Sequence, residues 1–527
     1  MNALAELISR AGREHAARVA VIDAERSFTF AQVEAASNRL ASALCLVYGL
    51  KKGDRVAVLL PNCAEFVIAD FALIKAGLIR VPVNPRFTGA EIEFIVTHCS
   101  AAALITCSAY AGALQSSRSL IAGPRPIIAV DALPGVSDAL LWRDVLEQGA
   151  EKTFATDTEA SDGYMLGYTS GTTGRPKGAL TNVRSRWAML FHTLANEMFV
   201  AEGDVMLHVA SLAHGSGTKV LPFFVKGAKN VLMPKFSPGD FFRLVQAHRV
   251  SISWMVPTIV AMLCDAEDRV GYDLSSLRTI IYGGAPMPEP VLERALAAFG
   301  PIFVQIYGLT EAPQPDLVLA KEDHLPDPVT GKRRAVGAAG RLATGVRMRL
   351  VDEESADVKP GEVGEIIIAG EHVMTGYWGD PLATDQTLRD DWCYTGDMAR
   401  IDAQGFYYIV DRKKDMIISG GYNVYPREVE DVLYRHPAVA ECAVIGSADP
   451  VWGETVHAVI VIRSDAEKDP ESISRHCAQS MAGYKKPRKF TFVPALPKTA
   501  NGKIDKKQLR AELSAAAKQD KLPETTA

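Results

Sequence analysis

The sequence has no long apolar segment. No run of apolar residues approaches the ~18 that a membrane-spanning helix needs, although 48% of the 527 residues are hydrophobic. The apolar centre of a secretory signal is also missing, because Glu6, Arg10, Arg13 and Glu14 interrupt the N-terminal stretch. The last residues, Thr525-Thr526-Ala527, are not a peroxisomal Ser-Lys-Leu signal. These absences predict a soluble cytoplasmic protein with no integral membrane association.

The eight cysteines lack the spacings that bind metals or build a disulfide framework. They are scattered from Cys45 to Cys477, and no pair is separated by two residues. We therefore expect neither a zinc site nor structural disulfides. Most of these thiols should be small buried side chains in a reducing compartment.

An excess of positive charge is missing as well. The formal net charge is −5, and charged residues make up an ordinary 23% of the chain. This balance gives no electrostatic basis for nucleic-acid binding, so we expect no nucleic-acid partner. The length allows a few domains with substantial cores.

Short apolar runs alternate with helical patterns along the chain. A capping box of Thr29 and Gln32 precedes a helical face that includes Val33, Leu40 and Leu44. Strands are expected at 55–60, 79–83, 103–107, 127–130, 205–210, 277–282 and 303–307, and helices at 63–76 and 185–195. This alternation predicts an α/β fold with a largely parallel sheet.

One glycine-rich stretch stands out, from Tyr168 to Gly178: Tyr-Thr-Ser-Gly-Thr-Thr-Gly-Arg-Pro-Lys-Gly. Its glycines let backbone N–H groups turn inward as anion-binding nests do, and its hydroxyls, Arg175 and Lys177 add donors and positive charge. Such a loop suits the triphosphate of a nucleotide. Taken alone, it could also be a flexible Gly/Ser/Thr surface turn, which is the less favoured alternative.

The stretch is not a P-loop of the Walker A type, which needs glycine, four residues, then Gly-Lys-Ser/Thr. Counting from Gly171 places Pro176 at the second glycine. Counting from Gly174 places Ala179 at the glycine and Leu180 at the lysine. Phosphoryl transfer of the P-loop kind therefore loses its main support.

Two later junctions join an expected strand to a turn, where open α/β sheets bind ligands. The first is Gly283-Gly284-Ala285-Pro286, whose small residues let a flat ring approach the backbone. The second runs from Tyr307 to Ala312. There Tyr307 offers a stacking face for adenine, Thr310 can donate to a phosphate, and Glu311 can hold Mg²⁺. Each junction could also be an ordinary turn.

Three further motifs follow. Thr395-Gly396-Asp397 offers a carboxylate for a vicinal diol, but it is also a common turn tripeptide. The charge run 411–415 separates two apolar stretches and could be a solvated face. Lys503 follows Asn501-Gly502, a tight turn that presents the next side chain at its tip, although a solvated tail lysine is the alternative.

These motifs, in this order, resemble those of the adenylate-forming enzymes: acyl- and aryl-CoA synthetases, firefly luciferase and the adenylation domains of nonribosomal peptide synthetases. The resemblance covers essentially the whole chain and is strongest to stand-alone acyl- or aryl-CoA ligases. It implies a large N-terminal domain (1–411) with parallel-rich sheets and a β-rich subdomain, and a small mobile α+β C-terminal domain (412–527).

The resemblance implies a ligase that joins a carboxylic acid to ATP, releases pyrophosphate and passes the acyl group to coenzyme A. ATP, Mg²⁺ and coenzyme A are the implied cofactors, and an aryl or medium- to long-chain acid the implied substrate. The 24 residues after Lys503 leave no room for a fused carrier domain, so a separate acyl carrier protein is the second choice of acceptor. A non-catalytic nucleotide sensor and an ATP hydrolase remain alternatives, and a homodimer is possible.

Site residues follow position by position from the resemblance. Lys503, Thr310, Glu311 and His214 match the catalytic residues, with Glu311 at the metal. The nucleotide-binding set is Thr169, Ser170, Gly171, Thr172, Thr173, Lys177, Gly284, Ala285, Pro286, Gln305, Tyr307, Gly308, Thr310, Asp397, Arg412 and Lys503.

The acyl pocket and the hinge are implied in the same way. The acyl set is His214, Gly215, Trp254, Gly283, Gly308 and Gln314, and the hinge with its coenzyme A-side loop is Lys414, Ser419, Gly420, Gly421 and Tyr422. His214 could equally be a structural histidine. Lys219 could meet a second substrate carboxylate, but lysine is rarely buried unpaired, so we expect it to point outward.

Overall fold

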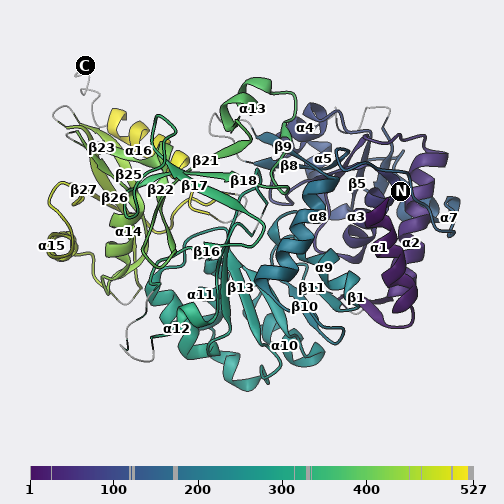
Figure 1. The fold of residues 1–527 in the computed structure, drawn as a ribbon, viewed down its shortest axis with the longest axis horizontal. Coiled ribbons are helices and arrows are strands. Elements are labelled where there is room, and N and C mark those ends of the chain that lie inside the picture. Colours follow the sequence, from purple (N-terminus) through teal and green to yellow (C-terminus); the bar gives the residue numbers. More distant parts are fainter. Residues whose placement is uncertain are drawn as a thin grey trace, which may run out of the picture.

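The computed structural model of the chain describes residues 2–24, 26–117, 120, 125–169, 176–313, 315–327, 331, 333, 335–419, 421–449, 452–464, 466–499 and 503–519. Within these residues the chain forms four β-sheets with helices packed around them (Figure 1). The expected mixed α/β fold with parallel-rich sheets is confirmed.

An eight-stranded sheet carries the strands on both sides of the glycine-rich stretch. In the described residues its order is β19-β9-β8-β4-β3-β5-β6-β7. The strands are β3 (Arg55–Val58), β4 (Ile79–Pro82), β5 (Ala103–Thr106), β6 (Ile127–Ala129), β7 (Leu140–Leu141), β8 (Gly163–Thr169), β9 (Lys177–Asn182) and β19 (Gly376–Tyr377). The strands from β7 to β8 run parallel, whereas β9 is antiparallel to both β8 and β19. The glycine-rich stretch therefore closes a β8–β9 hairpin.

A nine-stranded sheet, counted over the same residues, has the order β16-β15-β14-β13-β12-β10-β11-β1-β2. The strands are β1 (Val19–Asp23), β2 (Arg26–Thr29), β10 (Val205–His208), β11 (Lys229–Leu232), β12 (Ile252–Met255), β13 (Thr279–Gly283), β14 (Phe303–Tyr307), β15 (Leu317–Leu319) and β16 (Arg341–Leu342). From β1 to β14 the neighbours are parallel. The carboxyl ends of β13 and β14 therefore lie at the same edge, where such sheets bind ligands.

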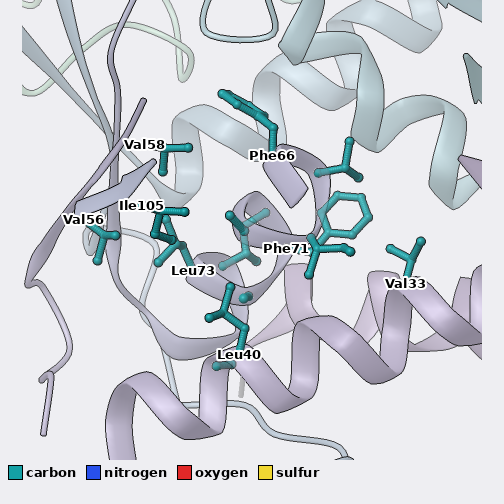
Figure 2. Close-up of a cluster of buried hydrophobic side chains, with 14 of the residues drawn as sticks. Val33, Leu40, Val56, Val58, Phe66, Phe71, Leu73 and Ile105 are labelled. Carbon is teal, nitrogen blue, oxygen red and sulfur yellow. The ribbon is translucent and has the colours of Figure 1, made fainter. Parts of the chain in front are cut away.

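The largest core surrounds one fully buried helix, α3 (Ala64–Ala76), every residue of which is buried. A helix that is apolar nearly all round is stable only inside a protein. It packs against α2 (Phe30–Ser42), which starts at the expected Thr29–Gln32 capping box. Figure 2 shows Val33 and Leu40 of α2 meeting side chains of α3, β3 and β5 in this core.

The other helices of the N-terminal part cover the sheets. They are α1 (Ala3–Glu14), α4 (Gly89–His98), α5 (Ala111–Gln115), α7 (Trp142–Gln148), α8 (Val183–His192), α9 (Val220–Val225), α10 (Pro238–His248), α11 (Pro257–Asp265), α12 (Glu289–Phe299) and α13 (Pro381–Thr387). Among the described residues, no helix combines the length and the apolar character needed to cross a bilayer.

A β-rich part follows, as expected for the subdomain. Its strands are β17 (Arg347–Val351), β18 (Gly364–Ala369), β20 (Leu388–Arg389), β21 (Trp392–Ile401) and β22 (Tyr407–Arg412). Thr395-Gly396-Asp397 is not a turn but lies inside β21, where Gly396 adopts a φ of 70°. The left-handed conformation of a glycine allows this irregular strand.

The C-terminal elements gather at one end of the molecule, opposite α1 to α3 (Figure 1). They are β23 (Ile417–Ser419), β24 (Tyr422–Val424), β25 (Val439–Asp449), β26 (Gly453–Ile462), β27 (Lys489–Phe492), α14 (Pro426–Tyr434), α15 (Pro470–Ser480) and α16 (Lys506–Gln519). Two apolar clusters are built from these elements and the segments between them. This part has the expected α+β composition.

The cysteines behave as small buried side chains. All eight are free, and six of them are buried. Burial raises the pKa of the Cys99 thiol to about 11, so this thiol stays protonated.

Candidate functional site

Three side chains from two sheets form a polar corner at the carboxyl end of β14. The Tyr307 hydroxyl donates to Asp397 Oδ2 at 2.6 Å, and Arg412 Nε lies 2.6 Å from Asp397 Oδ1. Arg412 Nη1 also donates to the Thr395 carbonyl at 3.2 Å. Burial and the nearby Asp397 carboxylate raise the pKa of Tyr307, so its hydroxyl remains a donor. Asp397 and Arg412, both in the expected nucleotide-binding set, are therefore brought beside the expected adenine platform.

Lys503 faces this corner from the C-terminal part. Its main chain lies in a tight reversal, because the Thr499 N–H donates to the Lys503 carbonyl at 2.7 Å. Solvent reaches the side chain, yet the protein around it lowers the pKa of the ammonium, mainly by desolvation and then through Arg412. The carboxylates of Asp397 and Glu311 partly offset this by raising the pKa of Lys503. Asn501 and Gly502, the expected turn, lie outside the described residues.

His214 lies in the same region. It precedes a short 3₁₀ helix, Gly215–Lys219, and its Nε2 atom is buried with no hydrogen-bond partner among the described residues. Desolvation, with the positive charges of Lys503 and Arg86, lowers the pKa of His214 to about 4. The imidazole is therefore neutral at physiological pH. A polar ring atom without a partner favours the substrate-side alternative for His214 over the structural one.

The β8–β9 hairpin, whose strands flank the expected phosphate loop (the phosphate-loop hairpin), contacts the turn after β14. Thr169 at the end of β8 pairs with Lys177 at the start of β9. A Cβ atom on Gly167 would come within 2.9 Å of Thr310 Cγ2, so the two segments are in direct contact. Ser170, Gly171, Thr172, Thr173, Gly174 and Arg175 lie outside the described residues.

Glu311 contacts a residue that the motifs did not indicate. Tyr377 donates its hydroxyl hydrogen to Glu311 Oε1 at 2.8 Å, and Lys177 Nζ lies 5.2 Å from the centroid of the Tyr377 ring. Burial and Glu311 raise the pKa of the Tyr377 phenol. No local spacing links residues 66 positions apart, so only the fold reveals this contact.

At the first strand–turn junction, Gly283-Gly284-Ala285-Pro286, the backbone packs closely against β14. A Cβ atom on Gly283 would come within 2.5 Å of the Ile306 carbonyl oxygen, so glycine is required there. Gly284 adopts a φ of 78°, and Gln305 Nε2 donates to the Ala338 carbonyl at 3.3 Å. Ala285 and Pro286 continue the turn beside the carboxyl end of β14. The expected adenine-side residues are thus adjacent to Tyr307 and Gly308.

The expected acyl residues lie along the nine-stranded sheet. Trp254 of β12 is 5% exposed, and its Nε1 atom has no partner among the described residues. It packs in an apolar cluster with side chains of β13 and β14. Gly215 follows His214 directly, and Gln314 lies outside the described residues.

The expectation that Lys219 points outward is wrong. Lys219 Nζ lies 2.5 Å from Glu197 Oε1, and neither side chain is exposed to solvent. Thr193 Oγ1 also accepts from Lys219 at 3.4 Å. Desolvation lowers the pKa of Lys219, and the Glu197 carboxylate opposes that shift. The carboxylate that compensates the burial of Lys219 therefore comes from this chain. The sequence did not reveal this pair because Glu197 and Lys219 are 22 positions apart.

Lys414 and the neighbouring loop lie between β22 and β24. Lys414 is exposed in a short 3₁₀ turn, Lys413–Asp415, and desolvation lowers its pKa. Tyr422 is 59% exposed and stacks on Tyr484 at 4.8 Å between ring centroids. Ser419 is buried at the end of β23, and Gly421 has a φ of 82°. Gly420 lies outside the described residues.

Comparison with known proteins agrees with this arrangement. The profile of the AMP-binding enzyme family matches residues 8–378, and that of the AMP-binding enzyme C-terminal domain matches residues 428–503. The chain therefore belongs to the AMP-binding enzyme family, and the resemblance expected from its motifs is confirmed.

Its relatives include acyl- and aryl-CoA ligases. The chain is 39% identical over 480 residues to the medium/long-chain-fatty-acid–CoA ligase FadD8 of Mycobacterium tuberculosis (strain ATCC 25618 / H37Rv), an alignment covering 88% of this chain and 82% of that one. It is 36% identical to a feruloyl-CoA synthase of an Amycolatopsis species, with 92% and 94% covered. The fold matches the anthranilate CoA ligase AuaEII in complex with anthranoyl-AMP with a TM-score of 0.87, at 29% identity, over 97% of this chain and 98% of that one.

Proposed function

We propose that the protein is an AMP-forming acid–thiol ligase that activates an apolar carboxylic acid with ATP and transfers the acyl group to coenzyme A. The observation that carries this proposal is the convergence of Lys503, Arg412, Asp397, Glu311 and His214 from separate elements. The fatty-acid and aryl-acid ligases among its relatives support the same reaction.

The first half-reaction joins two anions, so the site must supply positive charge and fixed donors. Lys503 would bridge the substrate carboxylate and the α-phosphate as a compact cation. Asp397 and Arg412 would hold the ribose, with Tyr307 beside the adenine. Because His214 is neutral, it can donate a hydrogen bond without competing with Lys503 for the carboxylate.

Mg²⁺ fits the residues that are present. Glu311 is a half-buried carboxylate beside the phosphate hairpin, and Mg²⁺ bound to nucleotides takes one or two carboxylates and keeps several waters. Glu311 would hold the ion, which would neutralise the charge of the departing pyrophosphate. Lys177, at the end of the phosphate loop, would add a second positive charge there.

A thiol then attacks the acyl carbonyl of the adenylate, and AMP leaves. Coenzyme A as the acceptor is supported by an exposed aromatic and basic surface on the C-terminal part. Arg488 lies 4.1 Å from the centroid of the half-exposed Trp452 ring, and the Tyr484 ring lies 5.6 Å from Lys485, whose ammonium is paired with Glu428. Rings and cations in this arrangement suit an adenine that carries phosphates. A separate acyl carrier protein is the alternative acceptor.

The two half-reactions take place at one site but need different residues beside the acyl group, and Lys503 serves only adenylation. We therefore place a hinge at Lys414, with a domain boundary between residues 411 and 412. The separate apolar clusters of the C-terminal part support a rigid unit that could turn about this point. We also propose a reducing, cytoplasmic location, which is consistent with the eight free cysteines.

The proposed function is tested by pyrophosphate release from Mg-ATP over a panel of aromatic, medium-chain and long-chain acids. The reactions are run with and without coenzyme A, and products are identified by mass spectrometry. We expect release that depends on the acid, and an acyl-CoA from one chemical class. Release without any acid would instead indicate an ATP hydrolase, and nucleotide binding without release would indicate a sensor.

A further inference from the structure

The segment 372–378 connects the phosphate hairpin to the turn that bears Glu311. On one side it pairs with β9, where Gly376 lies opposite Leu180 and the Trp378 N–H donates to the Gly178 carbonyl at 2.8 Å. β9 begins at Lys177, directly after the phosphate loop. This segment is therefore hydrogen-bonded to the strand that follows the loop.

On its other side the same segment holds the 308–316 turn at three points. The Met374 N–H donates to the Glu311 carbonyl at 2.8 Å, and the Tyr377 hydroxyl donates to Glu311 Oε1 at 2.8 Å. His372 Nε2 lies 2.6 Å from Asp316 Oδ1, and both side chains are completely buried. The main chain of Asp316 also closes the turn, because its N–H donates to the Tyr307 carbonyl at 2.8 Å.

Tyr377 is the one residue of this segment that contacts both functional side chains. Its hydroxyl binds the Glu311 carboxylate, while the face of its ring lies 5.2 Å from Lys177 Nζ. A hydrogen bond to one carboxylate oxygen restricts rotation of the group and fixes the direction of the other oxygen. The ring attracts the ammonium through its negative face and limits the positions that Lys177 can take.

We propose that Tyr377 is a positioning residue that sets the Glu311 carboxylate and the Lys177 ammonium in register for a Mg²⁺-bound triphosphate. This inference rests on the proposed function, in which Glu311 holds the metal and Lys177 the phosphates. Tyr377 itself touches no reacting atom. It acts by reducing the number of arrangements that the two charged groups can adopt before nucleotide binds.

Two substitutions separate the two contacts. Tyr377→Phe removes the hydrogen bond to Glu311 and keeps the ring beside Lys177, whereas Tyr377→Leu removes both. Tyr48→Phe is the matched control, because the Tyr48 hydroxyl donates to Gln148 at 3.1 Å on an exposed surface of the N-terminal part. Tyr377→Phe and Tyr48→Phe each remove one hydroxyl group, and Tyr377→Leu removes the hydroxyl and the ring together.

The direct measurement is Mn²⁺ binding, followed by electron paramagnetic resonance, to the enzyme with a non-hydrolysable α,β-methylene ATP analogue. Loss of an outer-shell partner weakens metal binding about 10- to 100-fold, so we expect about tenfold weaker binding for Tyr377→Phe. Tyr377→Leu should also weaken binding of the analogue itself, and Tyr48→Phe should match the wild type. Because no carboxylic acid is added, this result does not depend on the substrate or on ligase activity.

Activity measurements complete the test. In Tyr377→Phe, raising the Mg²⁺ concentration about tenfold should restore the adenylation rate, and thioester formation from supplied acyl-adenylate should be unchanged. Wild-type Mn²⁺ affinity in a folded Tyr377→Phe would overturn the proposal, as would an equal loss of both half-reactions. If Tyr377→Leu fails to fold, Tyr377→Phe still decides the outcome because it removes a single oxygen. Failure of the wild type to activate any acid would contradict the proposed function and not this role.

Discussion

The Tyr307 hydroxyl donates a hydrogen bond to Asp397 Oδ2 at 2.6 Å, although the two residues are 90 positions apart in the sequence. Tyr307 ends a strand of the nine-stranded sheet, and Asp397 lies within β21 of the β-rich part. One partly buried contact therefore joins two sheets at this polar corner. It also holds the Asp397 carboxylate between a phenol and the Arg412 guanidinium.

Asp397→Asn should weaken nucleotide binding. The amide keeps the shape of the side chain but removes the charge that pairs with Arg412 and that, in the proposed function, accepts the ribose hydroxyls. Hydrogen bonds to a charged group contribute about 1.5–3 kcal/mol, so the KM for ATP should rise roughly 10- to 100-fold. Steady-state kinetics with varied ATP measures this. Tyr408→Phe on the same hairpin removes a bond to Asp402 and should leave the KM unchanged; equal effects of the two substitutions would contradict the ribose role.

Glu197→Ala should destabilise the protein strongly. It leaves Lys219 buried without its carboxylate, and breaking one side of a buried ion pair costs about 3–5 kcal/mol. Deprotonation of Lys219 limits the loss at high pH, so the loss should be larger at pH 6 than at pH 9. Urea unfolding of the variant at both pH values checks the prediction. Glu197→Leu combined with Lys219→Met should recover most of the lost stability, and a single variant as stable as the wild type would refute it.

His208 should make the folded state less stable in mild acid. It is completely buried between Ser216 and Asn230, and burial lowers its pKa from 6.5 to about 4. Below pH 6.5 the unfolded chain binds a proton that the folded protein takes up only near pH 4, so stability falls across this window. At pH 5 the loss is ~2 kcal/mol relative to pH 8. In His208→Asn the slope of unfolding free energy against pH should be smaller between pH 4 and 6.5; an unchanged slope would contradict the account.

A surface ion pair joins α14 of the C-terminal part to α12 of the N-terminal part. Arg435 Nη2 of α14 lies 3.5 Å from Glu289 Oε2 of α12. Both side chains are partly exposed, so the pair contributes about 0–1 kcal/mol. Glu289→Lys should therefore slow pyrophosphate release only about two- to fivefold, and Arg435→Glu in the same protein should restore the rate. No recovery in the double variant would show that the pair does not support this domain arrangement.

Local patterns predicted those elements whose signals lie within a few residues. The capping box at Thr29 placed the start of α2, and the strand expected at 303–307 is the observed β14. Longer-range contacts gave no such signal. Lys219 was placed outward because its partner, Glu197, lies on another segment. Thr395-Gly396-Asp397 has the composition of a turn, but pairing within the sheet outweighs local preference.

In the candidate site, too, residues with a local signal were predicted and contacts between distant segments were not. Gly283, Tyr307 and Glu311 were predicted because each lies at or shortly after the end of an expected strand, and ligands bind at that edge. The contact of Tyr377 with Glu311 could not be predicted, since it depends on β19 pairing with β9. The roles of the phosphate-loop residues 170–175 stay predictions from the sequence.

The central claim is that Lys503 serves adenylation and not thioester formation. Lys503→Ala removes the cation that bridges the carboxylate and the α-phosphate, and Lys507→Ala, four residues on, is the matched control. We would measure acid-dependent pyrophosphate release and, separately, acyl-CoA formation from supplied acyl-adenylate. The account predicts at least a hundredfold loss of the first in Lys503→Ala with the second largely retained, and neither affected in Lys507→Ala. Equal loss of both half-reactions in Lys503→Ala, or no loss of adenylation, would contradict it.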